Sequence, residues 1–195
     1  LWAIGETILM AFLGTMGGAI LALPLAFLAA RNFAPLMAVR MPTRRLFDFI
    51  RGVDALIWTI ILSRAFGLGP LTGALAILIT DTGTFGKLFS EAIESIEPGP
   101  VEGIRATGAS KIQEVIFGVI PQVIPLWTSY TLYRFEANVR SASVLGIVGA
   151  GGIGVTLYQN FRSFNYQNVC AILIILVVTV SVIDTISARI RNHFV

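Results

Sequence analysis

The sequence predicts an all-α membrane protein, a polytopic helical bundle with about five spans. Hydrophobic residues make up 55% of the 195 residues and charged residues 13%, whereas soluble domains carry about 25% charged residues. The mean hydropathy is +0.81. Residues 7–30 and 163–183 contain no charged side chain, and each is long enough for the ~20 residues of a spanning helix. This composition excludes an ordinary soluble domain.

The apolar runs give the order of the expected spans. They cover residues 7–30, 46–66, 70–90, 121–140 and 166–188. Pro98 and Pro100 separate the third span from the polar segment after it, because proline ends or bends a helix. The sequence opens on Leu1 rather than methionine, so we expect a further N-terminal piece, which could hold one more span.

Basic residues predict the orientation of the bundle. The connection after the first span carries four arginines and no acidic residue: Arg31, Arg40, Arg44 and Arg45. Cytosolic loops have an excess of lysine and arginine, so we expect this connection in the cytosol. Alternation then places residues 91–111 and 189–193 in the cytosol. The turn at Gly67 and residues 141–165 are expected outside.

A charged segment interrupts the apolar chain between the third and fourth spans. Its sequence, EGIRATGASKIQEVIFGVIP, covers residues 102–121. We expect a short helix over 101–107, a sharp turn with positive φ at Gly108, and a second helix over 109–120 that Pro121 stops. Such a hairpin along the membrane face suggests that a water-soluble partner binds it. The alternative is a loop of solvated charges without a partner.

The spacing of Glu102, Gly108 and the pair Ile120 and Pro121 resembles the EAA loop of ABC importer permeases. In that family the loop inserts into a groove of the ATP-hydrolysing subunit. The resemblance therefore implies that residues 97–121 form a cytosolic coupling loop. It assigns contact with the ATPase to six residues: Glu102, Arg105, Ala106, Gly108, Ala109 and Lys111. The sequence departs from the family pattern at Gly103 and Ile104, where two alanines are usual, and at Gly118, where isoleucine is usual.

Longer segments resemble the phosphonate ABC transporter permease. They read SEAIESIEPGPVEGIRATGASK, PQVIPL and YRFEANVRSASVLGIVGAGGIGVTLY. The resemblance implies that residues 1–195 form one transmembrane permease domain, a helical bundle of the MetI-like type, in the bacterial inner membrane. It also implies contact with membrane lipid, a second copy of the chain, two cytosolic ABC ATPase subunits and a periplasmic phosphonate-binding protein.

The sequence contains no complete catalytic or cofactor-binding motif, so we do not expect an enzyme. The segment DTGTFGKL, residues 81–88, fails as a Walker A loop at both ends, because Asp81 replaces the first glycine and Leu88 replaces Ser or Thr. The single histidine and single cysteine do not form a metal-ligand pattern. We therefore expect no cofactor in this chain, with ATP and Mg²⁺ bound by the partner ATPases. Basic residues do not form a patch with interleaved aromatics, so no nucleic-acid partner is expected.

Charged residues inside the expected spans are candidates for a substrate pathway, because a charge at mid-depth costs at least ~2.5 kcal/mol. Arg51 and Asp54 are spaced to share one helical face, and Glu136 and Arg140 are spaced likewise, with Arg134 close by. Each pair suits a structural ion pair. The alternative is that an arginine receives a passing phosphonate oxyanion. Arg51 and Arg140 are the preferred candidates for that role.

A glycine-rich stretch follows the fourth span. Gly149, Gly151 and Gly154 satisfy G-x-G-x-x-G, but no expected strand precedes them and the next acidic residue, Asp184, lies in or beside the last span, so dinucleotide binding is rejected. Gly149, Gly151 and Gly152 are instead candidates for an outer gate. Close backbone packing is the equal alternative.

The resemblance implies a homodimeric permease that imports organophosphonate by alternating access, driven by partner ATPases. An importer for a related solute, such as phosphite, a phosphate ester or methionine, would share every feature. A secondary transporter driven by ions would show an internal repeat with interrupted spans, and no repeat is found. A structural scaffold is disfavoured by the charges inside the spans.

Overall fold

The computed structural model describes residues 2–33 and 37–194 of the chain. Its helices, in chain order, are α1 (Trp2–Ala29), α2 (Met37–Gly52), α3 (Ala55–Phe66), α4 (Pro70–Glu94), α5 (Pro98–Ala106), α6 (Lys111–Gln113), a π-helix (Glu114–Val119), α7 (Ile120–Leu145), a 3-10 turn (Gly146–Val148), α8 (Gly152–Arg162) and α9 (Tyr166–Phe194). The all-helical fold class is confirmed. We call residues 98–119, which comprise α5, α6 and the π-helix, the elbow.

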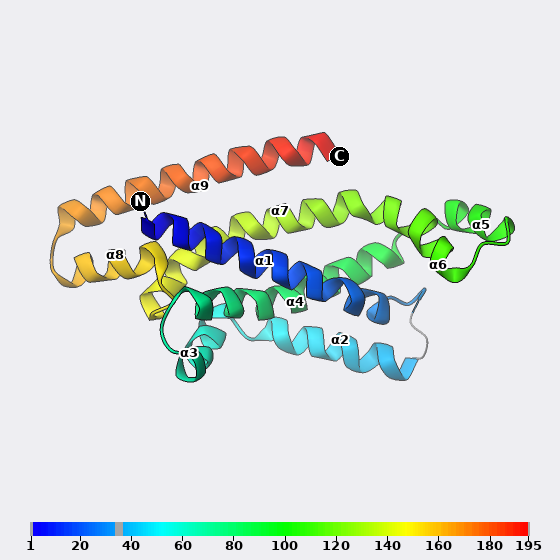
Figure 1. The fold of residues 1–195 in the computed structure, drawn as a ribbon, viewed down its shortest axis with the longest axis horizontal. Coiled ribbons are helices and arrows are strands. Elements are labelled where there is room, and N and C mark those ends of the chain that lie inside the picture. Colours follow the sequence, from blue (N-terminus) through cyan, green and yellow to red (C-terminus); the bar gives the residue numbers. More distant parts are fainter. Residues whose placement is uncertain (1, 34–36, 195) are drawn as a thin grey trace.

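The long helices form one bundle with two distinct ends. Figure 1 shows α1, α2, α4, α7 and α9 side by side, with the elbow extending beyond one end. Helix α1 ends and α2 begins at that same end, whereas α3, α8 and the start of α1 lie at the opposite end. This arrangement agrees with the alternation predicted from the basic residues. Which end faces the cytosol stays a prediction.

Fewer helices than predicted are long and apolar enough to span a membrane. Within the described residues they number three: residues 2–29, 111–148 and 166–191. The predicted span over 46–66 is wrong as a single helix, because α2 ends at Gly52 and a new helix, α3, starts at Ala55. Asp54 is the reason, since its side chain accepts a hydrogen bond from the Leu56 N–H at 2.8 Å and so caps α3.

The predicted third span lies within α4, which is one helix of 25 residues. Its mean hydropathy is lowered by Asp81, Lys87, Glu91 and Glu94. These charged residues lie on a helix that crosses the whole bundle beside α1 and α2. The helix is therefore central to the fold although its composition is not that of a lipid-exposed span.

Glycines bring α1 and α4 into close contact. Gly14 and Gly18 have the GxxxG spacing of tightly packed membrane helices. A Cβ atom added at Gly14 would lie 2.7 Å from the Cβ atom of Ile77, and one added at Gly18 would lie 2.8 Å from that of Asp81. Only hydrogen fits at these two positions, so the two helices are held at a short separation.

A valine at Gly14 should destabilise the bundle by about 1–3 kcal/mol, because it forces α1 and α4 apart. Gly5→Val is the matched control on the same helix, since a Cβ atom there meets no atom within 4 Å. Thermal unfolding of the detergent-solubilised protein measures both. Equal unfolding temperatures for the two variants would contradict the close contact.

Aromatic side chains fill the half of the core nearest the elbow. Phe85 and Phe89 of α4 stack with ring centroids 5.1 Å apart. Trp127 of α7 lies 4.9 Å from Phe89 and 6.2 Å from Phe27 of α1. This cluster joins α1, α4 and α7 at the end of the bundle next to the elbow.

Candidate functional site

The elbow turns sharply at the glycine that the sequence singled out. Gly108 has φ +80°, a conformation that glycine adopts at little cost, and its N–H donates to the Arg105 carbonyl at 3.0 Å. The predicted first helix is confirmed as α5, which reaches Ala106. After the turn, the Ser110 N–H donates to the Gln113 side chain at 2.8 Å and starts α6.

The prediction that Pro121 stops the second helix is wrong. The chain passes from α6 through the π-helix into α7 without a break. In the π-helix the Ile120 N–H donates to the carbonyl of Val115, five residues back. This wider turn leads into the first turn of α7, where the missing N–H of proline is tolerated.

A bidentate ion pair links the two helical parts of the elbow, α5 and the π-helix. Arg105 of α5 donates from Nε and Nη2 to the two carboxylate oxygens of Glu114, each at 3.0 Å. The hydrogen bond to Glu114 raises the pKa of the Arg105 guanidinium further above its usual value, so this arginine stays charged. The pair spans Gly108 and fixes α5 against the π-helix.

The predicted coupling residues lie together on the elbow surface. Glu102, Arg105, Ala106, Gly108 and Lys111 are exposed and Ala109 is half-buried. Large apolar side chains accompany them, with Ile112 72% exposed and Phe117 65% exposed. Exposed apolar side chains among charges are typical of a protein-binding surface. The role of these residues in contact with an ATPase stays a prediction.

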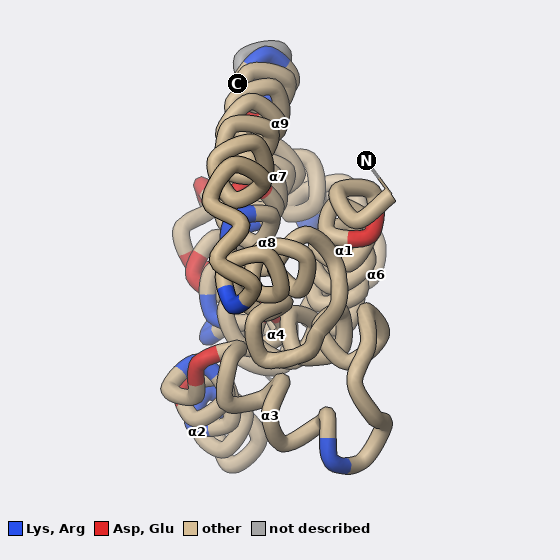
Figure 2. Tube along the Cα trace, turned by 90° about the vertical axis from the view of Figure 1, so that its left-hand side faces the viewer, with Lys and Arg blue, Asp and Glu red and all other residues tan. Residues whose placement is uncertain are grey.

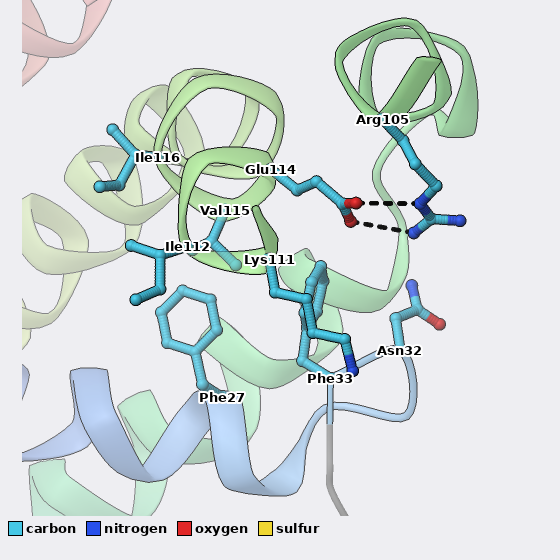
Figure 3. A pocket seen from close by; sticks show the side chains of 9 residues that line it. All are labelled: Phe27, Asn32, Phe33, Arg105, Lys111, Ile112, Glu114, Val115 and Ile116. Atoms are coloured by element: carbon cyan, nitrogen blue, oxygen red, sulfur yellow. Dashed lines mark hydrogen bonds and ion pairs between the residues drawn. The ribbon is translucent and has the colours of Figure 1, made fainter. Parts of the chain in front are cut away.

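A hollow of about 620 Å³ lies between the elbow and the end of α1. Figure 3 shows Phe27 and Phe33 on the α1 side facing Ile112 and Val115 of the elbow. Its lining residues are Phe27, Asn32, Phe33, Arg105, Lys111, Ile112, Glu114, Val115 and Ile116. Because the hollow is not filled by side chains, the elbow is less tightly packed against α1 here than α1 is against α4.

A buried polar cluster joins three helices in the middle of the bundle. Asp81 of α4 is fully buried and accepts hydrogen bonds from Arg134 and Asn138 of α7. The Asn138 amide also donates to the Thr15 hydroxyl of α1 at 2.8 Å. Arg134 was predicted as a pathway residue, but Asp81 and Asn138 were missed. The signal for Asp81 was its charge inside the predicted third span, but the sequence alone assigned it no role in a pathway.

Neither predicted intrahelical ion pair forms. Arg51 is exposed at the end of α2 and Asp54 caps α3, so they do not share a helical face. Arg140 donates instead to both carboxylate oxygens of Asp184 on α9, at 3.2 Å each. Glu136 is buried, and its Oε1 atom has no hydrogen-bond partner in the described part of the chain.

The glycine-rich stretch packs against the N-terminal end of α1 and the turn before α4. Gly149, Gly151 and Gly152 all have positive φ. The Gly152 N–H donates to the Glu6 carboxylate at 3.2 Å, and the Ile153 N–H donates to the Thr7 hydroxyl at 2.9 Å. These contacts support the close-packing alternative. The gate role stays a prediction.

Known proteins are similar to this chain in sequence. Residues 22–195 match the family described as binding-protein-dependent transport system inner membrane component. A protein of Escherichia coli strain K12, named as a cryptic phosphonate transport system permease protein, PhnE2, is 60% identical over 121 residues, which are 62% of this chain and 99% of that protein.

Two further relatives align with nearly the whole chain. The phosphate-import permease protein PhnE of Mycolicibacterium smegmatis is 40% identical over 187 residues, 96% of this chain but 35% of that protein. The phosphite transport system permease protein PtxC of Stutzerimonas stutzeri is 41% identical over 189 residues, 97% of this chain and 69% of that protein. The chain thus spans about a third of the length of the mycobacterial relative.

The fold is similar to a solved structure. A chain of the MetNI methionine ABC transporter, in an inward-facing conformation, superposes with a TM-score of 0.85 and 22% identity, covering 99% of this chain and 94% of that chain. This likeness concerns the fold, and it confirms the predicted MetI-like bundle.

Proposed function

This chain belongs to the family of binding-protein-dependent transport system inner membrane components, and from that membership we propose that it forms the pathway of an importer for phosphonates. As a family member it is a permease subunit of the inner membrane, and ATP hydrolysis belongs to a separate subunit. The observation that carries the phosphonate proposal is the 60% identity with a protein named as a phosphonate permease.

Two cytosolic ATPase subunits, each with its own ATP and Mg²⁺, are the proposed partners of the elbow. The elbow suits this role because it projects beyond the bundle and exposes Ile112 and Phe117 among charged side chains. Glu102, Gly108 and Lys111 would lie at this contact. A second copy of the chain would complete the pathway, and a periplasmic binding protein would deliver the solute to the end where α8 lies.

The proposed contacts with the ATPases, the second copy and the binding protein suit a mechanism of alternating access. ATP-driven closure of the ATPases would move the two elbows, and the helices continuous with them would switch between inward-facing and outward-facing arrangements. Such switching requires two states whose balance each ligand shifts. The Arg105–Glu114 pair supports this transmission because it joins both arms of the elbow.

A reconstituted importer tests the substrate. The permease, its ATPase and its binding protein are placed in liposomes, and ATP turnover is measured with 2-aminoethylphosphonate, phosphate, phosphite and methionine. We expect the phosphonate to stimulate turnover most. Stimulation by methionine without stimulation by any phosphorus oxyanion would contradict the proposal.

An importer for phosphite or phosphate is the second candidate. It is favoured by the two relatives named for those anions, which align over 96% and 97% of this chain. The same assay separates the candidates, because the binding protein that assembles with the permease determines which anion stimulates turnover.

A further inference from the structure

One face of α4 carries a polar stripe that the other described residues cover only in part. Thr80, Thr84 and Lys87 are half-buried and Glu91 is exposed. Their spacing of four, three and four residues places them on one side of the helix. Other sides of α4 are closed by packing, at Gly14 and Gly18 of α1 and at Phe47 of α2.

Charged residues of two more helices flank this stripe. Lys87 lies 3.2 Å from the Asp48 carboxylate of α2, and both side chains are half-exposed. On the α7 side, Arg134 keeps 24% of its side chain exposed while it pairs with Asp81. Figure 2 shows both acidic and basic positions on α2 and basic positions on α9.

The part of this surface that carries Lys87 and Arg134 does not suit contact with lipid. A charged group at bilayer depth is costly and almost always faces protein or a water-filled cavity. The exposed side of α9 is of the opposite kind, with Ile174, Val177 and Val178 at 57–64% exposure, as expected of lipid contact. The stripe on α4 therefore faces water or protein in the membrane.

We infer that the stripe on α4 is the wall of a water-filled anion passage and that Arg134 is the residue that contacts the oxyanion. This inference rests on the proposed function and specifies its substrate contact. It places the contact at Arg134 rather than at Arg51 or Arg140, the residues preferred from sequence.

The geometry of Arg134 supports this assignment. Its Nε and Nη2 atoms both donate to Oδ1 of Asp81, and Nη1 has no hydrogen-bond partner within the described residues. Asp81 is itself held by the Asn138 amide. The guanidinium is thus held by Asp81 through Nε and Nη2, and 24% of the side chain stays exposed, which leaves donors for a phosphonate oxygen.

The pairing of Arg134 with Asp81 also suits weak, transient binding of an anion rather than tight binding. Asp81 pairs with Arg134 and offsets its charge, so an anion would be attracted but not trapped, as conduction requires. Arg140, in contrast, uses its Nη1 atom on both oxygens of Asp184. Arg51 lies on the exposed side of α2, next to the break before α3.

Charge-selective thiol labelling tests the passage in the assembled importer. Thr84→Cys is introduced with Cys170→Ser, because Thr84 lies one helical turn from Asp81 and Cys170 is the only native cysteine. We expect Thr84→Cys to react with both anionic and cationic methanethiosulfonates, the anionic one faster. Arg134→Gln should lower the anionic-to-cationic rate ratio about fivefold, whereas Arg134→Lys should keep it.

Two controls make the result specific. Arg140→Gln in the same background should leave the ratio unchanged, and Val177→Cys on the apolar side of α9 should react with neither reagent. An unreactive Thr84→Cys would show that lipid or a second copy covers the stripe and would overturn the passage. A ratio that Arg134→Gln leaves unchanged would overturn the role of Arg134.

Substrate protection separates this inference from the proposed function. Saturating phosphonate with its binding protein should slow labelling of Thr84→Cys when Arg134 is present and should not when it is Gln. If phosphonate neither stimulates ATP turnover nor protects, while phosphate does both, the proposed substrate is wrong and the anion contact stands. If phosphonate stimulates turnover but never protects, the contact at Arg134 is wrong and the proposed function stands.

Discussion

Replacing Asp81 with asparagine is expected to destabilise the permease by about 3 kcal/mol, because it leaves the Arg134 guanidinium without its counter-charge inside the bundle. Asp81 is fully buried and 24% of the Arg134 side chain is exposed, so water reaching the guanidinium can replace only part of the lost charge. The asparagine keeps the size of the side chain and can still accept from Asn138. The loss therefore reports the charge rather than a cavity.

A double-mutant cycle measures this interaction. Unfolding temperatures of Asp81→Asn, Arg134→Gln and the double variant in detergent should be non-additive, with the double variant more stable than Asp81→Asn. Asp184→Asn is the matched control, since it breaks the exposed pair with Arg140 and should cost no more than about 1 kcal/mol. Additive effects, or equal losses for Asp81→Asn and Asp184→Asn, would refute a special role for the buried pair.

Gly108→Pro is expected to leave the permease in the membrane but to reduce transport-linked ATP turnover by about 5- to 150-fold, the range of a typical coupling free energy. Proline fixes φ near −65° and has no N–H. Gly108 requires φ +80° and donates its N–H to Arg105. The substitution therefore breaks the turn and separates Arg105 from Glu114.

The measurement compares ATP turnover of the reconstituted importer with and without the transported solute. Gly108→Ala should give an intermediate loss, because a Cβ atom costs about 1–2 kcal/mol in the left-handed region. Gly103→Ala is the control within α5, where an added Cβ atom meets nothing within 4 Å. Normal coupled turnover in Gly108→Pro would count strongly against the elbow as the coupling element.

The elbow was predictable because local chemistry determines it. Gly108 follows a short polar helix and precedes Ser110, so a turn with positive φ can be inferred without tertiary information. The course of the chain after Pro121 was not predictable in the same way. Proline normally ends a helix, and only the π-helix before it allows α7 to continue.

The ion pairs were not predictable because their partners come from different helices. Spacing along one helix suggested Glu136 with Arg140, but Arg140 pairs with Asp184, which is 44 residues away in sequence. Arg134 and Asp81 are 53 residues apart. Sequence periodicity identifies which face a charge occupies, but the neighbouring helix on that face follows from packing of the whole bundle. The break at Asp54 was missed because its capping role was read as a charge inside a span.

The unbroken run of helix from Lys111 to Val148 gives the permease a lever arm. Its 38 residues would extend about 55 Å at 1.5 Å per residue. A tilt of about 5° at the elbow would then displace the far end by roughly 5 Å, by the same geometry. Because Arg134 lies partway along this rod and the glycine turns lie at its tip, one small rotation at the water-exposed end would move both, without any further signal passing between helices.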